Sequence, residues 1–198
     1  MNVAVLVEES TETAFKETLR DFLRPRLDRM PKLHFIPYDG RLPKGSELRR
    51  RVEKLLDGHD AVVALTDVYT GSSDFTDAAD AKTKMRLWVG DNANFYAHAA
   101  QYEFEAWLLP FWPAIQRLAG HNKSAPQGQP EQINHTHPPS ARIKEIFELG
   151  TSRDSYVKPR DAKRILKGKD LLESIQACPE LKAFVNTIIS LSGGTIII

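Results

Sequence analysis

The sequence predicts an α/β protein in which a mostly parallel sheet is flanked by helices and followed by a helical C-terminal part. Three short segments have the apolar, β-branched composition typical of strands: Val3–Val7, Leu33–Ile36 and Asp60–Thr66. The two segments between them carry apolar residues at the spacing of amphipathic helices. This alternation implies parallel strands that are joined by right-handed crossovers.

The two helices have similar signals. The first is expected after Ser10 and Thr11, which can cap its first turn. Its apolar stripe recurs at i, i+4, i+7 and i+8: Phe15, Leu19, Phe22 and Leu23. The second is expected after Ser46 and is expected to end at Asp57-Gly58. Its stripe has the same spacing: Leu48, Val52, Leu55 and Leu56.

The middle of the chain is less regular. Asp74–Met85 is acidic and rich in small residues, which indicates a loop with a short helix. In Phe95–Tyr102 apolar residues alternate with others, as they do in a strand. Glu103–Leu118 is expected to be helical, with breaks or kinks at Pro110 and Pro113.

Composition divides the chain into three parts. Residues 1–119 are expected to form the α/β core. Residues 120–139 contain four prolines and are expected to form an irregular loop or lid. Residues 140–198 are expected to be helices packed on the core, the first of them capped by Ser140. The terminal Ile196–Ile198 either pairs as an edge strand or enters the groove of a homo-oligomer.

Composition and charge exclude several classes of protein. The 27 basic and 26 acidic residues give a net charge of +1, so no overall field marks a binder of nucleic acid or membranes. Cys178 is the single cysteine, which excludes a disulfide framework and a Cys-based zinc site. The apolar stretches are too short to span a bilayer, and Met1-Asn2-Val3 does not begin a signal peptide. We therefore expect a soluble cytoplasmic domain without a membrane partner.

Charge is nevertheless segregated along the chain. Between Asp60 and Glu105 there are eight acids and three bases, whereas between Ala141 and Lys169 there are nine bases and four acids. An acidic centre beside a basic rim suits a metal site that handles phosphates. The alternative is that the two segments attract each other or form solvated faces.

Carboxylates stand where the ligands of an open parallel sheet collect, after the carboxyl ends of strands. Glu8 and Glu9 follow the first strand, and Asp67 follows the third. If these strands are neighbours, they lie about 4.8 Å apart, and a hard divalent cation would relieve the repulsion between the carboxylates. Glu103 and Glu105 form a further pair, which faces one way on a strand but diverges on a helix. Any one of these acids is most simply a helix cap, and the three sets together favour a metal site.

Other motifs carry less information. His135-Thr136-His137 is a candidate metal pair, but beside two prolines it fits a loop better. The chain contains no P-loop, no G-x-G-x-x-G fingerprint and no G-x-S-x-G nucleophile elbow.

Three segments resemble a bacterial family known as a domain of unknown function, family 4276: Val7–Glu12, Leu65–Tyr69 and Gln101–Leu109. Shorter pieces match its C-terminal half: Ile133-Asn134, Pro139–Ile143, Tyr156–Lys158 and Cys178–Leu181. The most specific piece reads Glu-Phe-Glu-Ala-Trp-Leu-Leu and spans Glu103–Leu109. The family is similar to Toprim domains, the metal-binding fold of topoisomerases, primases and overcoming-lysogenization nucleases. Its members often lie beside ATPases in mobile-element and phage-defence loci.

The resemblance implies a Toprim-like (Rossmann-like) sheet and Mg²⁺ or Mn²⁺ as cofactor. Glu8 is then the first acidic residue, and Asp67 is the aspartate at the later strand end. Two positions depart from the pattern. Glu9 stands where the family usually has Gly, and Tyr69 stands where Toprim enzymes carry the second Asp of Asp-x-Asp.

The leading hypothesis is a Mg²⁺-dependent nuclease that cleaves DNA or RNA in an anti-phage defence system with an ATPase partner. The candidate catalytic and metal-binding residues are Glu8, Asp67, Glu103 and Glu105, with Glu103 or Glu105 replacing the ligand lost at Tyr69. The candidate nucleic-acid-binding residues are Arg142, Lys158, Arg160 and Arg164. We expect the free protein to be inactive, with residues 120–139 as the lid.

Two other functions remain open at this point. The near-neutral charge and the missing aspartate favour a catalytically inert Toprim-like subunit that regulates or scaffolds an ATPase complex. A metal-dependent phosphatase or nucleotide-processing enzyme on the same sheet is the third reading.

Overall fold

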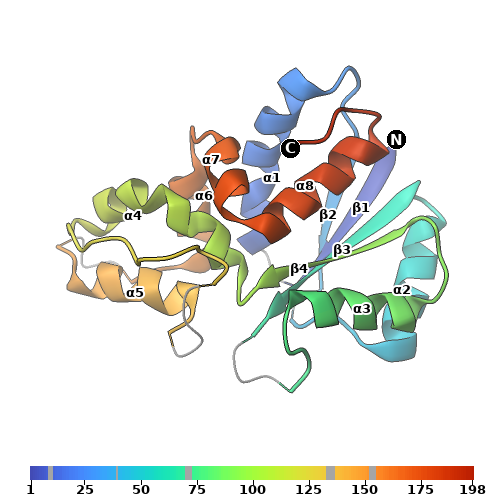
Figure 1. Ribbon diagram of the computed structural model, residues 1–198, viewed down its shortest axis with the longest axis horizontal. Coiled ribbons are helices and arrows are strands. Elements are labelled where there is room, and N and C mark those ends of the chain that lie inside the picture. The colour runs from blue at the N-terminus through green and yellow to red at the C-terminus, as the bar shows by residue number, and fades with distance from the viewer. Residues whose placement is uncertain (9–10, 39, 70–72, 133–136, 152–154) are drawn as a thin grey trace.

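The computed structural model describes the chain except for residues 9–10, 39, 70–72, 133–136 and 152–154 (Figure 1). Its strands are β1 (Asn2–Val7), β2 (Lys32–Pro37), β3 (Ala61–Val68) and β4 (Phe95–Gln101). Its α-helices are α1 (Thr11–Leu23), α2 (Gly45–Leu56), α3 (Ala78–Val89), α4 (Trp112–Ala119), α5 (Pro139–Leu149), α6 (Lys158–Leu166), α7 (Leu171–Ala177) and α8 (Pro179–Leu191). Two 3-10 helices, η1 (Arg24–Arg26) and η2 (Phe104–Phe111), complete the described elements.

The four strands form one parallel sheet in the order β2-β1-β3-β4. The expected α/β class, with a parallel sheet, flanking helices and a helical C-terminal part, is confirmed. The first and third strands in the sequence are neighbours, and Val7 pairs with Leu65. The register between β3 and β4 pairs Asp67 with Ala100. These pairings bring the carboxyl ends of β1, β3 and β4 to the same edge of the sheet.

Alternation along the strands divides the core between the two faces of the sheet. On one face, Val3, Val5 and Val7 pack with residues of α1, η2 and α8. On the other face, Ala4 and Leu6 pack with residues of α2 and α3. Figure 1 shows these layers, with α1 and α8 on one side of the sheet and α2 and α3 on the other. Every residue of β3 is buried, which explains why its sequence is apolar almost throughout.

Several boundaries differ from the sequence-based expectation. The acidic segment after β3 contains a twelve-residue helix, α3, which begins after Asp77 because the Asp77 carboxylate accepts a hydrogen bond from the Asp80 amide. The proline-containing segment after β4 is split into η2 and α4, and Pro110 lies inside η2. Ser140 is not the cap of α5, since that helix begins at Pro139.

The last residues lie back along α8 instead of joining the sheet. The amide of Ile197 donates to Oδ1 of Asn186 at 2.8 Å, and Nδ2 of Asn186 donates to the carbonyl of Ile197 at 3.0 Å. Ile196 and Ile198 remain exposed beside this contact. In the described part of the chain, no helix has the length and apolar character that crossing a membrane requires.

Candidate functional site at the carboxyl edge of the sheet

Glu8 leaves β1 at the carboxyl edge of the sheet and is 2% exposed. Because Val7 pairs with Leu65, Glu8 comes level with Thr66 on β3. The Thr66 hydroxyl donates to Oε1 of Glu8, and the Leu42 amide donates to the same oxygen at 3.4 Å. Burial raises the pKa of Glu8, and these hydrogen bonds oppose that rise because they stabilise the carboxylate.

Tyr69 forms a hydrogen bond with the other oxygen of Glu8. Its hydroxyl donates to Oε2 at 2.9 Å. The Arg41 guanidinium lies 4.9 Å from the centre of the Tyr69 ring and also binds Asp74 at 3.1 Å. The residue that replaces the second aspartate of the Asp-x-Asp pattern is therefore in direct contact with the first acid of the predicted site.

Asp67 lies one residue further along β3 and is 6% exposed. Its Oδ1 accepts a hydrogen bond from the Phe104 amide at 3.0 Å, so its carboxylate caps the start of η2. The turn between β4 and η2 includes Tyr102, a non-glycine residue with a left-handed φ of 71°. Asp67 and Glu8 thus stand at adjacent strand ends, and their carboxylates accept hydrogen bonds from different groups.

Glu103 and Glu105 diverge, as expected for an i, i+2 pair that enters a helix. Oε2 of Glu103 accepts from the Ser140 amide at 2.8 Å and thereby caps α5. Glu105 is 1% exposed and points to another part of the chain. Its Oε1 lies 3.4 Å from Nζ of Lys158 and accepts from the Tyr156 hydroxyl at 3.3 Å.

The environment of Glu105 makes this carboxyl harder to ionise than an ordinary glutamate. Burial raises the pKa of this carboxyl to about 6, the Lys158 ammonium opposes the rise, and the negative charge of Glu103 adds to it. The same burial, with the charge of Glu105, raises the pKa of Tyr156. Lys158 therefore has an internal partner, and any phosphate that binds it must compete with Glu105.

The predicted nucleic-acid-binding arginines also have internal partners. Arg160 and Arg164 bind the buried carboxylate of Asp161 at 2.9 and 3.0 Å. Burial opposes ionisation of Asp161, but the two guanidinium groups and the Val157 amide hold its pKa below its ordinary value. Nε of Arg142 donates to the carbonyl of His137 at 3.2 Å. The side chains of Arg160 and Arg164 as a whole remain close to half exposed.

The donor set fits a divalent cation in part. Glu8, Thr66 and Asp67 offer the hard oxygen ligands that Mg²⁺ prefers. Within the described residues, however, no group of three or more His, Cys, Asp or Glu side chains is placed to hold an ion. Mg²⁺ commonly binds through one or two carboxylates and completes its shell with water and substrate phosphates. Glu9 and the His135-Thr136 part of the candidate histidine motif lie outside the described residues.

Glu131 is a buried carboxylate that the sequence-based reasoning missed. Its Oε1 accepts from the Trp107 indole at 2.8 Å, and its Oε2 accepts from the Glu180 amide at the start of α8 at 2.9 Å. Burial raises its pKa. The available signal was that Glu131 is the only acid among residues 120–139. It ties this irregular segment to η2 and α8.

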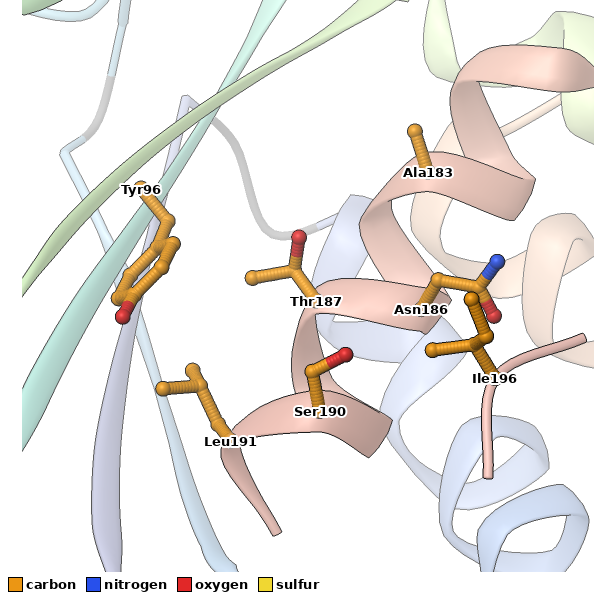
Figure 2. Close-up of a pocket in the computed structure, with 7 residues that line it drawn as sticks. All are labelled: Tyr96, Ala183, Asn186, Thr187, Ser190, Leu191 and Ile196. Carbon is orange, nitrogen blue, oxygen red and sulfur yellow. The ribbon is translucent and has the colours of Figure 1, made fainter. Parts of the chain in front are cut away.

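A hollow of about 440 Å³ lies away from this edge, between β4 and α8. Figure 2 shows the Tyr96 ring facing Thr187 and Leu191, with Ile196 beside Asn186. Among the residues that the structure describes, no carboxylate, lysine, arginine or histidine lines this hollow. It therefore offers neither a metal ligand nor a charged side chain for a phosphate.

The parallel sheet and its flanking helices define an α/β domain that has buried acids at the carboxyl edge of the sheet. Among solved structures, the fold matches the C-terminal region of the Burkholderia pseudomallei OLD protein with a TM-score of 0.54 and 14% sequence identity. The match covers 94% of this chain and 96% of that one. At this identity the likeness concerns the fold alone.

The particular family follows from the sequence. Residues 7–189 match the model of the domain of unknown function DUF4276, and the chain belongs to this family. The resemblance drawn from the three strand-end segments is thereby confirmed. A sequence search of curated proteins finds no match.

Proposed function

We propose that the protein is a Toprim-like nuclease that hydrolyses phosphodiester bonds of DNA or RNA with Mg²⁺ or Mn²⁺. The observation that carries this proposal is the placement of two buried carboxylates, Glu8 and Asp67, at the ends of adjacent central strands. In open parallel sheets, the carboxyl edge is where ligands bind. The nuclease class comes from the resemblance of the family to Toprim domains, and the likeness to the OLD protein C-terminal region supports the fold on which such chemistry would rest.

Glu8 and Asp67 would hold the cation, with water and substrate phosphate in the remaining positions. The bound cation would polarise the scissile phosphate and lower the pKa of an attacking water. Thr66 and the Leu42 amide orient Glu8 by fixing one of its oxygens. Tyr69 must release the other oxygen of Glu8 if that oxygen is to bind the cation. Glu103 stands two residues beyond β4 and is the further acid available at this edge.

A second candidate is a catalytically inert Toprim-like subunit that regulates an ATPase partner. The hydrogen bond from Tyr69 to Glu8 favours it, because this contact satisfies an oxygen that a metal ligand needs. An ATPase partner and a role in anti-phage defence belong to both candidates. Under the nuclease proposal, the partner would shift Tyr69 away from Glu8 and strengthen a metal binding that the free protein already has, whereas under the second candidate it would use this edge only for docking.

Calorimetric titration with Mn²⁺ distinguishes the two candidates. The wild type is expected to bind saturably, and Glu8→Gln and Asp67→Asn are each expected to lose at least tenfold in affinity. Both substitutions keep a hydrogen-bond acceptor for the amides and hydroxyls that contact these side chains. Glu173→Gln on α7 is the matched control, because Glu173 is exposed and far along the chain from both strand ends.

Circular dichroism must show that each variant keeps its fold. Loss of Mn²⁺ binding in both strand-end variants, with the control unchanged, supports the nuclease and warrants cleavage assays with an ATPase partner. A wild type that binds no Mn²⁺, alone or with a single-stranded oligonucleotide present, contradicts the nuclease proposal and supports the inert subunit.

A further inference from the structure

A second hollow, of about 360 Å³, lies between α1 and β2. We refer to it as the α1–β2 hollow. Its lining includes four side chains that are or can become positively charged: Lys16, Arg20, Lys32 and His34. Lys16 and Arg20 are one turn apart on α1, and Lys32 and His34 alternate on β2, so both elements direct their basic residues to one place. None of the described residues that line the α1–β2 hollow is an acid.

Among the side chains that the structure describes, no acid neutralises the charges of this hollow. Across the residues that the structure describes, Lys16, Arg20 and Lys32 make no ion pair or side-chain hydrogen bond. The two nearest acids along α1 have other partners. Glu17 binds Lys163 at 3.2 Å, and Asp21 binds Arg24 at 3.6 Å. Three cations that share a hollow without a counter-charge repel one another, and a polyanion relieves this repulsion.

The His34 side chain is held in place by a contact with His59. Its Nδ1 lies 2.9 Å from Nε2 of His59, and Nδ1 of His59 donates to the Leu55 carbonyl at 2.9 Å. Because the carbonyl can only accept, Nδ1 of His59 is the donor of that bond, and Nε2 of His59 is the atom left to pair with His34. The side of His34 imidazole that lines the hollow is thereby fixed by a chain of two hydrogen bonds.

Another basic hollow shows what is unusual about this one. On α2, Arg50, Arg51 and Lys54 share a hollow with Glu47, whose carboxylate accepts a hydrogen bond from Tyr38. That hollow carries its own counter-charge. The α1–β2 hollow does not, although both contain three lysine or arginine side chains.

We propose that the α1–β2 hollow binds backbone phosphates of a nucleic-acid strand. His34 pairs with Ala4 on β1, four residues before Glu8. At about 3.3 Å per residue, the hollow lies roughly 13 Å from Glu8 along the strand direction. A strand held here can therefore extend to the carboxyl edge. The inference rests on the proposed function for the identity of the ligand, and it adds a binding site on a different element from the predicted Arg142, Lys158, Arg160 and Arg164.

The test is binding of a fluorescent single-stranded oligonucleotide, measured by anisotropy in EDTA at several salt concentrations. The triple variant Lys16→Ala, Lys32→Ala, Arg20→Ala is expected to bind at least tenfold more weakly than the wild type in 0.1 M salt. Loss of three phosphate contacts should also reduce the slope of log affinity against log salt by about 2. The matched control is Arg50→Ala, Lys54→Ala, which removes exposed cations from the hollow on α2.

EDTA keeps this test separate from the metal site. Glu173→Gln, at an exposed position on α7 outside the metal site, is expected to bind the oligonucleotide as the wild type does, and this expectation holds even if the nuclease proposal fails. Equal binding by the wild type and the triple variant contradicts the inference, as does an equal loss in the control. Two further outcomes also contradict it. In the first, the triple variant loses micromolar binding of inorganic phosphate but binds the oligonucleotide as the wild type does. In the second, the triple variant loses binding to anionic lipid vesicles but not to the oligonucleotide.

Discussion

The Tyr69 hydroxyl donates a hydrogen bond to Oε2 of Glu8 at 2.9 Å, across the ends of two adjacent strands. The resemblance to Toprim domains places the second aspartate of their Asp-x-Asp pattern at the position of Tyr69. An aspartate there would add a negative charge beside Glu8, whereas the tyrosine supplies a donor that stabilises the Glu8 carboxylate. With tyrosine in place of aspartate, there is less negative charge at this edge for a cation to neutralise. A substitution of Tyr69 therefore tests directly whether its hydroxyl competes with a cation for Glu8.

Tyr69→Phe is expected to bind Mn²⁺ more tightly than the wild type, by up to about tenfold. The substitution keeps the ring that Arg41 covers and removes only the hydroxyl that occupies Glu8. Calorimetric titration of both proteins in the same buffer measures the change. Tyr38→Phe is the control, because its hydroxyl binds Glu47 on α2. Equal Mn²⁺ affinity in wild type and Tyr69→Phe would show that Tyr69 does not compete with the cation.

Glu105 should make the stability of the protein depend on pH. Its pKa is about 6 in the folded protein, against an ordinary value of 4.5. Between these values the folded protein holds a proton that the unfolded chain has lost, so the free energy of unfolding falls as pH rises from 4.5 to 6. Relative to Glu105→Gln, the wild type is expected to lose about 2 kcal/mol over this window.

Urea unfolding of both proteins at pH 4.5, 5, 6 and 7 measures the difference. Glutamine keeps an acceptor for Tyr156 and does not titrate, so the variant isolates the proton on Glu105. Glu148→Gln, at an exposed position on α5, serves as the control and should leave the pH profile of the wild type unchanged. A wild-type-minus-variant difference that stays constant from pH 4.5 to 7 would refute the raised pKa.

Glu131→Ala is expected to destabilise the protein by about 3 kcal/mol. The variant leaves the buried indole N–H of Trp107 without its partner and removes the carboxylate that caps α8. Glu131→Gln retains one oxygen acceptor and should cost less. Urea unfolding followed by tryptophan fluorescence measures both, with exposed Gln132→Ala as the control from the same segment. If Glu131→Ala and Gln132→Ala have the same stability, the contact with Trp107 does not hold the segment in place.

Removing both arginines that bind Asp161 should also destabilise the fold. Arg160→Ala with Arg164→Ala leaves a fully buried carboxylate without its ion pairs, at a cost of about 3 kcal/mol at pH 7. The loss should shrink as pH falls through the titration of Asp161, because protonation removes the unpaired charge. Urea unfolding at pH 7 and pH 4 tests this. Arg142→Ala, which loses a single hydrogen bond to a carbonyl, should destabilise the protein by less than about 1 kcal/mol. If Arg142→Ala costs as much stability as the double variant, the unpaired charge of Asp161 does not explain the loss.

The sequence predicted the strands better than the helix starts. Continuous apolar runs identify β1 and β3 because only a strand covered on both faces excludes polar residues over such a length. The prediction that Ser140 caps α5 was wrong for a physical reason. The carboxylate of Glu103, a residue 37 positions earlier, accepts the hydrogen bond of the Ser140 amide and so caps the helix in its place. A cap supplied by a distant segment leaves no local pattern.

The sequence by itself determined the parallel α/β order, the family, and the arrival of acids at the ends of β1 and β3. These depend on hydrophobic periodicity and on residues adjacent in the chain. Only the tertiary structure decided the partner of each acid: Tyr69 for Glu8, η2 for Asp67, and Lys158 for Glu105. Hydrogen-bond partners and pKa shifts depend on burial and on distances between segments far apart in sequence, which the fold alone sets.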